Sequence, residues 1–340
     1  MTPQRLNEIL ERLRRGRIAV LGDFALDAWW HADMRISELS RETPYYTMPV
    51  VREEYGCGGA SNVAENVRAI GVETVIALTV FGEDWRAGVL GGLLERAGVD
   101  TSRIIRDRRR FTITYGKPIL HGFEAVQEAP RLDFNNRGHL PDGLRDELLG
   151  RLRTVCGEID ALIVQDQIAN GVVDDTVRAE LTKLTAAGTP EVVVVDSRFC
   201  IADYIGCITK PNNHELWEAL HTTAATEPEG LEWMPAAAAE LAARTGRPVF
   251  ATCGPDGCVV ADGRQTHRVP APRVDGPIDT IGAGDACLAA AAAALAAGSD
   301  PAEAAAVATL AATTTVEQVG TTGTIRPDRM RELCERTNAQ

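Results

Sequence analysis

The residues best suited to chemistry form the run Asp-Thr-Ile-Gly-Ala-Gly-Asp at positions 279–285. Gly282 and Gly284 allow a sharp turn and a close approach of the backbone to a ligand. Strong helix formers follow over 286–297, so the turn leads into a helix N-terminus, where unpaired N–H groups favour an anion. For Asp285, beside that anion, the natural task is to accept a proton from a hydroxyl that attacks a phosphoryl group. An ordinary glycine turn before an alanine-rich core helix is the alternative, and the complete run favours the functional interpretation.

The elements around this turn alternate regularly. Short apolar runs typical of buried strands occur at 18–21, 72–81, 161–164, 191–195 and 248–252. Helical segments are predicted over 85–97, 141–157, 172–187, 286–297 and 301–317, and an acidic loop over 225–236. Strands that alternate with helices predict an α/β fold with a mainly parallel, doubly wound sheet. Because no long Gly-, Ser- or Pro-rich linker divides the chain, we expect one domain over 1–340.

Two segments depart from this alternation, and we predict that they form a small, partly exposed sheet, called the lid below. Residues 28–57 interleave aromatic and Val side chains with charges and prolines, and 111–134 add two further strands. Aromatic side chains such as Tyr45 and Tyr46 exceed what a monomer usually exposes in one patch. The lid is therefore predicted to be the interface of a homodimer.

Composition excludes several classes of function. The net charge of −13 argues against sequence-independent nucleic-acid binding, which needs a basic face, but not against an anionic substrate. The eight cysteines include no C-x-x-C pair and no zinc spacing, and the N-terminus has no apolar signal core, so we expect a cytoplasmic protein with reduced thiols. The apolar run at 286–297 is too short to span a bilayer. No P-loop motif occurs. The basic run at 103–110 fits a phosphate site or a solvated turn, and we favour the turn.

Several motifs together carry a family resemblance. They are Val-Leu-Gly-Asp-x-x-Leu-Asp-x-Trp-Trp at 20–30, Gly-Gly-Ala-x-Asn-Val-Ala at 58–64, Arg-Leu-Asp-Phe at 131–134 and the run at 279–285. The chain resembles the ribokinase-like (PfkB) sugar kinases over about 17–325. Within that family it is most similar to the kinases of heptose 7-phosphate in ADP-heptose synthesis. The nucleotidyltransferase domain that often accompanies them is not expected in these residues, since no Gly-Thr-Phe-Asp or His-x-Gly-His run occurs.

The resemblance implies a ribokinase-like fold with a lid, often at a dimer interface, and the cofactors ATP and Mg²⁺; it leaves open a monovalent cation. Asp285 resembles the catalytic base, and the N–H groups of Gly282, Ala283 and Gly284 resemble the anion hole. Sugar contacts are expected from Asp27, Gly58, Gly59, Asn62, Lys117, Arg131 and Asp166. Nucleotide contacts are expected from Asn212, Glu215, Thr252, Gly254, Gly257, Asp279, Thr280, Thr309 and Gly320. Asn212 and Glu215 match the element that organises Mg²⁺ and its waters.

Some of these residues also have a purely structural interpretation. Asp27 ends an apolar strand, where ligands gather in open α/β sheets, but a turn or cap aspartate looks the same. Asn62, Asn212 and Glu215 each stand where a residue could simply cap a helix.

The chain also departs from the heptose kinases. Tyr115 and Lys117 stand where they have Lys and Arg, the run Asp-Gln-Ile-Ala-Asn-Gly at 166–171 replaces Asp-Tyr-x-Lys-Gly, and Thr309 replaces an Asn on the adenine side. The first two departures lie on the expected substrate side, so the sugar stays open.

We therefore predict an ATP- and Mg²⁺-dependent kinase of a sugar or sugar phosphate, with heptose 7-phosphate as the leading candidate. A phosphate tail needs cations, and basic residues of the lid segments, including Arg35, Arg52, Lys117 and Arg131, could supply them. A ribokinase- or fructokinase-like kinase of a free sugar or a nucleoside is one alternative. A non-catalytic sugar- or nucleotide-sensing protein is another, which the intact Asp285 and its glycine turn disfavour.

Overall fold

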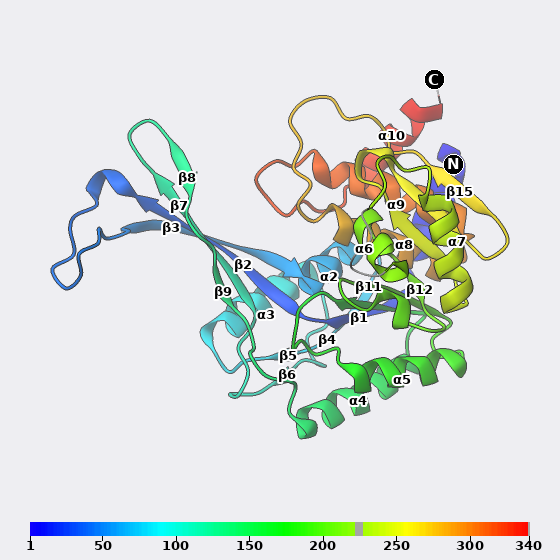
Figure 1. Ribbon diagram of the computed structural model, residues 1–340, viewed down its shortest axis with the longest axis horizontal. Helices are drawn as coiled ribbons and strands as arrows, with labels where there is room; N and C mark the ends of the chain where they lie inside the picture. The colour runs from blue at the N-terminus through cyan, green and yellow to red at the C-terminus, as the bar shows by residue number, and fades with distance from the viewer. Residues whose placement is uncertain (222–226, 339–340) are drawn as a thin grey trace.

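Eight strands form one large sheet in the computed structural model, which describes residues 1–221 and 227–338 (Figure 1). In order across the sheet they are β4 (Thr74–Leu78), β1 (Arg17–Gly22), β10 (Ala161–Asp166), β11 (Val192–Ser197), β12 (Ile208–Thr209), β13 (Val249–Thr252), β14 (Cys258–Ala261) and β15 (Thr266–Val269). Neighbours from β4 to β13 run parallel, and β14 and β15 continue the sheet antiparallel. The predicted mainly parallel sheet is confirmed.

Unbroken burial along β1 from Ile18 to Gly22 shows that helices cover both faces of this sheet. Ile18 and Val20 belong to one buried cluster, whereas Ala19 and Leu21 belong to another on the opposite face. The first cluster includes side chains of α1 (Pro3–Leu13), α2 (Ala60–Ala69), α3 (Trp85–Ala97), α8 (Ala283–Ala296), α9 (Pro301–Val316) and α10 (Pro327–Asn338). The second includes side chains of α4 (Asp142–Cys156) and α5 (Asp175–Ala186). A third cluster packs α6 (Asn213–Leu220) and α7 (Met234–Thr245) on β13 and β14. This is a doubly wound arrangement.

A smaller sheet projects from this body (Figure 1). Its strands are β3 (Val50–Gly59), β2 (Phe24–Asp33), β7 (Thr114–His121) and β8 (Val126–Glu128) in that order, with β9 (Leu132–Phe134) also paired to β7. The expected small sheet is thus present, although its first strand begins before residue 28 and the segment 111–134 forms three strands instead of two. Within the predicted lid segment 28–57, the side chains of Tyr45, Tyr46 and Val51 are exposed.

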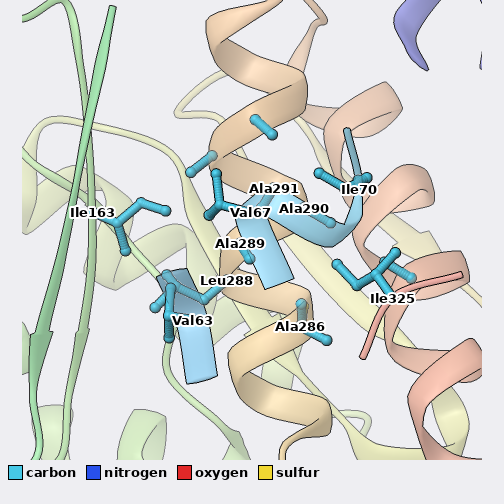
Figure 2. Close-up of a cluster of buried hydrophobic side chains, with 14 of the residues drawn as sticks. Val63, Val67, Ile70, Ile163, Ala286, Leu288, Ala289, Ala290, Ala291 and Ile325 are labelled. Atoms are coloured by element: carbon cyan, nitrogen blue, oxygen red, sulfur yellow. The ribbon is translucent and has the colours of Figure 1, made fainter. Parts of the chain in front are cut away.

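Helix α8 lies at the centre of the helical layer that carries α2. Figure 2 shows Val63 and Val67 of α2 facing Leu288 and the small Ala289 of α8. Alanine side chains allow two helices to approach closely, because the separation of packed helices depends on the side chains at their contact. This packing brings the first turn of α2 beside the N-terminus of α8.

Several boundaries differ from the predictions. The run 72–81 is not one strand: β4 joins the large sheet, whereas β5 (Val80–Phe81) pairs with β6 (Ile105–Arg106). Helix α5 begins three residues later than expected, where Asp174 caps it. Of the expected acidic loop at 225–236, residues 225–226 lie outside the described residues, and its last residues begin α7. Helix α10 was not foreseen. Among the described helices, none is long and apolar enough to cross a membrane.

The basic run at 103–110 is only partly the solvated turn that we favoured. Arg108 and Arg109 are exposed, but Arg110 is buried and donates hydrogen bonds to the carbonyl oxygens of Gly138 (2.8 Å) and Asn170 (2.9 Å). The prediction is wrong for Arg110, because its guanidinium satisfies backbone carbonyls of two distant loops. The described residues also include the 3₁₀ turns η1 (Met34–Ile36), η2 (Ile201–Asp203) and η3 (Gly254–Asp256).

Candidate active site

The turn at the start of α8 requires glycine at position 282. Gly282 has a φ of +81°, in the left-handed region, and a Cβ added there would lie 2.9 Å from Nδ2 of Asn62. The turn is closed by the N–H of Ala283, which donates to the carbonyl oxygen of Thr280 at 3.2 Å. That N–H closes the turn in this structure, so its place in an anion hole stays a prediction.

Asp285 lies in the first turn of α8 and is held by two amide side chains. Asn62, in the first turn of α2, donates from Nδ2 to Oδ2 at 2.8 Å. Gln165, in β10, donates from Nε2 to Oδ1 at 2.7 Å. Burial raises the pKa of Asp285 to about 6, against the opposing effect of these two hydrogen bonds. The carboxylate is thus ionised at neutral pH but is a better proton acceptor than an exposed aspartate.

Asn62 is itself fixed by a further hydrogen bond. Nδ2 of Asn66, one turn along α2, donates to Oδ1 of Asn62 at 3.0 Å, and Oδ1 of Asn66 accepts the backbone N–H of Ile325 at 2.9 Å. Both asparagines are buried. The amide of Asn62 is therefore orientated with its nitrogen toward Asp285 by a chain that reaches the C-terminal segment.

Asp279 connects the glycine turn to the loop that follows α9. Its Oδ1 accepts the N–H of Ile281 at 3.0 Å and its Oδ2 accepts the N–H of Gly320 at 3.1 Å. Gly320 has a φ of +81°. Asp279, Thr280 and Gly320, all predicted as nucleotide contacts, thus lie together, and Asp279 has a structural task there whether or not a nucleotide binds.

A buried ion pair lies beneath the glycine turn. Nζ of Lys210 is 3.0 Å from Oδ2 of Asp196, and both side chains are almost fully buried. A Cβ added at Gly284 would be 3.9 Å from that ammonium. Burial lowers the pKa of Lys210, but Asp196, together with Cys287 and Glu215, outweighs this effect and the pKa is raised. Neither residue of the ion pair was predicted for the site. The one sequence signal was that Lys210 stands two residues before Asn212, a predicted nucleotide contact.

Asn212 and Glu215 form a capping box at the N-terminus of α6. Oδ1 of Asn212 accepts the N–H of Glu215 at 2.8 Å, and Oε2 of Glu215 accepts the N–H of Asn212 at 2.9 Å. Burial raises the pKa of Glu215, and Asp196 adds to the effect. The capping alternative is therefore realised, which leaves a role towards Mg²⁺ as a prediction.

The other predicted nucleotide residues lie near that capping box or in α9. Thr252 pairs with Asn212 in a parallel β-bridge. Gly257 has a φ of +92°, and a Cβ there would be 2.0 Å from the carbonyl oxygen of Val269, so only glycine fits. Gly254 also has a positive φ, of +55°. Thr309 is buried in α9.

Four of the predicted sugar contacts lie on the smaller sheet: Asp27, Gly58, Gly59 and Lys117. Asp27 is buried in β2, with Oδ2 3.8 Å from Nζ of Lys117 in β7. A Cβ at Gly58 would be 3.0 Å from Cγ of Asp27, and Gly59 takes a left-handed φ of +55°. Burial raises the pKa of Asp27, while Lys117 and Arg131 oppose the rise.

Arg131 and Asp166 are engaged elsewhere. Arg131 donates to both carboxylate oxygens of Asp133, at 2.6 and 2.7 Å, and lies 4.6 Å over the ring of Tyr115. Oδ2 of Asp166 accepts from Ser197 (3.0 Å), Tyr204 (2.7 Å) and Arg178 (3.2 Å). Asp166 is therefore tied to α5 and the segment after β11. A sugar contact from Asp166 stays a prediction, and the residue that reaches Asp285 is its neighbour Gln165, which was not predicted for the site.

The chain matches one protein family over most of its length and has relatives among curated proteins. The match is to the pfkB family carbohydrate kinases, over residues 25–328. The chain is 32% identical to the bifunctional protein HldE of Rhodospirillum rubrum over 96% of this chain and 64% of that protein. It is 33% identical to HldE of Caulobacter sp. over 83% of this chain and 55% of that protein. The chain thus spans less than two thirds of the length of either relative.

Solved structures show the same fold. Phosphofructokinase-2 from Escherichia coli, in complex with potassium, has a TM-score of 0.70 at 21% identity and covers 95% of this chain and 99% of its own. Ribokinase from Arabidopsis thaliana, complexed with ribose and ATP, has a TM-score of 0.68 at 17% identity, over 94% of this chain and 99% of its own. The predicted ribokinase-like fold is confirmed. Because the family match extends from β2 to the start of α10, the chain belongs to the pfkB family of carbohydrate kinases and is a phosphotransferase of that family.

Proposed function

We propose that this chain transfers the γ-phosphoryl group of ATP to a hydroxyl of a sugar phosphate, and that heptose 7-phosphate is the substrate. One observation carries the mechanism: Asp285 stands in the first turn of α8, beside the left-handed Gly282, with each carboxylate oxygen held by an amide. This is the geometry that a base at a phosphate-binding helix N-terminus needs.

The chain's own residues supply the proton acceptor and a site for negative charge. The hydroxyl proton passes to the carboxylate of Asp285 as the hydroxyl oxygen bonds to the γ-phosphorus. The bond from phosphorus to the bridging oxygen breaks, and ADP leaves with that electron pair. N–H groups at the start of α8 favour the charge on the transferring group. With its pKa raised to about 6, Asp285 is ready to accept the proton at neutral pH.

The residues near α6 fit a Mg²⁺ ion held mainly by other ligands. Among the residues that the structure describes, no group of three or more His, Cys, Asp and Glu side chains could hold a metal by itself. Asn212 and Glu215 offer the oxygen atoms that Mg²⁺ prefers, and each already spends one oxygen on the capping box. They would therefore hold the ion through water, with ATP phosphates completing its shell. Bound Mg²⁺ neutralises phosphate charge. A monovalent cation stays a prediction of the family resemblance.

The choice of heptose 7-phosphate rests on sequence relatives and on one cation. The curated relatives at about 30% identity are named HldE, the heptose 7-phosphate kinases that the motifs resemble. Lys117 is the cation that we assign to the phosphate of the sugar, because it lies next to the expected sugar contact Asp27 but at 3.8 Å is too far from that carboxylate for a hydrogen bond. Arg131, which is paired to Asp133, is the weaker candidate.

The test is ADP release from ATP with a panel of acceptors: heptose 7-phosphate, fructose 6-phosphate, ribose, fructose and adenosine. We expect fastest turnover with heptose 7-phosphate, and a loss of kcat by ~10²–10⁴ in Asp285→Asn with little change in ATP affinity. Faster turnover of a free sugar or nucleoside would replace the substrate. Binding without ADP release would favour a sensing protein, and full activity of Asp285→Asn would reject the mechanism.

The lid is proposed to form a homodimer. Its exposed apolar side chains include Tyr45 and Tyr46, which are 73% and 70% exposed, and Val51. Exposed apolar side chains gathered in one segment of a chain are typical of an interaction surface. A second copy of this chain is the occupant that we propose, in keeping with the lid interface that the family resemblance implies.

A further inference from the structure

Gln165 is a buried residue at the carboxyl end of β10, and among the described residues its side chain makes one hydrogen bond. It is 2% exposed, and its Nε2 donates to Oδ1 of Asp285 at 2.7 Å. Its Oε1 is buried and has no hydrogen-bond partner among the described residues. A buried acceptor without a partner costs stability, so this glutamine is not explained as a structural link between elements.

The orientation of the amide follows from its partner. An ionised carboxylate only accepts hydrogen bonds, so the Gln165 amide must turn its nitrogen toward Asp285 and leave its oxygen on the other side. That oxygen lies on the side of Gly59, where an added Cβ would be 3.7 Å from it. The amide thus gives up one hydrogen bond in order to contact the carboxylate.

We propose that Gln165 is a positioning residue for phosphoryl transfer, which together with Asn62 clamps both oxygens of the Asp285 carboxylate in the orientation that receives the proton. The proposal rests on the proposed function, in which Asp285 is the base. Each oxygen of a carboxylate offers about two lone-pair sites. Because each amide occupies one, each oxygen keeps a site for the substrate hydroxyl.

The clamp also sets the charge state of the base. Two charged groups face Asp285 from neighbouring elements: Asp196 in β11, which raises its pKa, and Lys210 after β12, which lowers it. Burial raises the pKa of Asp285 most, and the hydrogen bonds from Asn62 and Gln165 lower it to a net value of about 6. Loss of the Gln165 donor should therefore raise the pKa of Asp285, and an added carboxylate at 165 should raise it further.

Two variants of nearly equal size test this. Gln165→Met removes the donor, and Gln165→Glu replaces it with a second acid. Gln265→Glu, the same change at an exposed residue between β14 and β15, is the control. The first readout needs no substrate: a pH titration of the side-chain carboxyl ¹³C resonance of Asp285 in aspartate-labelled protein, assigned by its absence in Asp285→Asn. The second is the acid limb of kcat/KM with ATP and heptose 7-phosphate.

We expect the pKa of Asp285 to rise by about one unit in Gln165→Met and by roughly two units or more in Gln165→Glu. The acid limb should move with it, kcat at pH 7 should fall at least tenfold in Gln165→Glu, and Gln265→Glu should match the wild type. If Gln165 is merely structural, the Gln165 variants should lose thermal stability but keep the wild-type pKa of Asp285 and the wild-type acid limb of kcat/KM. That result would overturn the proposal. If Asp285→Asn stays active, the proposed function fails instead, whatever the two Gln165 variants do.

Discussion

Gly282→Ala should separate backbone strain from damage to the site. The substitution puts a side chain on a residue with a φ of +81°, which costs about 1–2 kcal/mol for an L-residue. Its Cβ would also come within 2.9 Å of Nδ2 of Asn62, which is closer than real Cβ atoms approach. Asn62 cannot simply move aside, because Asp285 and Asn66 hold its amide. We expect the clamp on Asp285 to be displaced.

Gly298→Ala is the matched control at the other end of the same helix. Gly298 also has a φ of +81°, but a Cβ there would meet nothing within 4 Å. In urea unfolding, the strain should lower the free energy of unfolding of both variants by about 1–2 kcal/mol. For Gly282→Ala the free energy of unfolding should fall by up to ~1.5–3 kcal/mol more if the hydrogen bond from the Asn62 amide to the Asp285 carboxylate breaks. A misplacement of the base by about 1 Å costs on the order of 10²-fold in kcat, whereas Gly298→Ala should keep the wild-type kcat.

ADP release with ATP and heptose 7-phosphate measures kcat for the two alanine variants. If Gly282→Ala turned over within about threefold of Gly298→Ala, the contact between residue 282 and Asn62 would not position the base, and the reasoning would be refuted.

The remaining predictions concern charge and assembly. Because the pKa of Asp285 is raised from 3.8 to about 6, kcat/KM should rise with pH through about 6, and an acid limb near pH 4 would contradict this. The contribution of this group to the free energy of unfolding should instead fall as pH rises from about 4 to 6, since the folded state binds the proton more tightly than the unfolded state does. Lys210→Met leaves the buried Asp196 without its cation and should lower the free energy of unfolding by ~3–5 kcal/mol in urea. The double variant Lys210→Met/Asp196→Leu should largely restore it, and an equal loss in both variants would argue against a buried ion pair. Lys117→Met should raise KM for heptose 7-phosphate roughly ten- to a hundredfold more than KM for unphosphorylated heptose, and equal effects would remove Lys117 from the phosphate site. Light scattering at micromolar concentration should give a dimer mass, and Tyr45→Asp should shift it toward the monomer; a monomeric wild type would reject the lid interface.

Features that depend on neighbours along the chain could be predicted from the sequence. The alternation of apolar runs and helical segments determined the doubly wound sheet. The Asn-x-x-Glu spacing at Asn212 and Glu215 determined a capping box, whose two hydrogen bonds span three residues. The two glycines before a run of helix formers predicted the sharp turn in which Gly282 takes its φ of +81°. These contacts are local, so residue type and spacing were sufficient.

The clamp on the base was decided by the tertiary structure alone. Gln165 and Asp166 are adjacent and both polar at the end of a strand, and only Asp166 was predicted for the site, as a sugar contact implied by the family resemblance. Side chains of successive strand residues point to opposite faces, so only one of the two can reach α8. Which one does depends on the register of β10 in the sheet and on the packing of α8, 120 residues away along the chain. That packing turned Gln165 toward Asp285 and Asp166 toward Arg178 on α5, because a strand's pattern of polar residues does not state which layer of helices each face will meet.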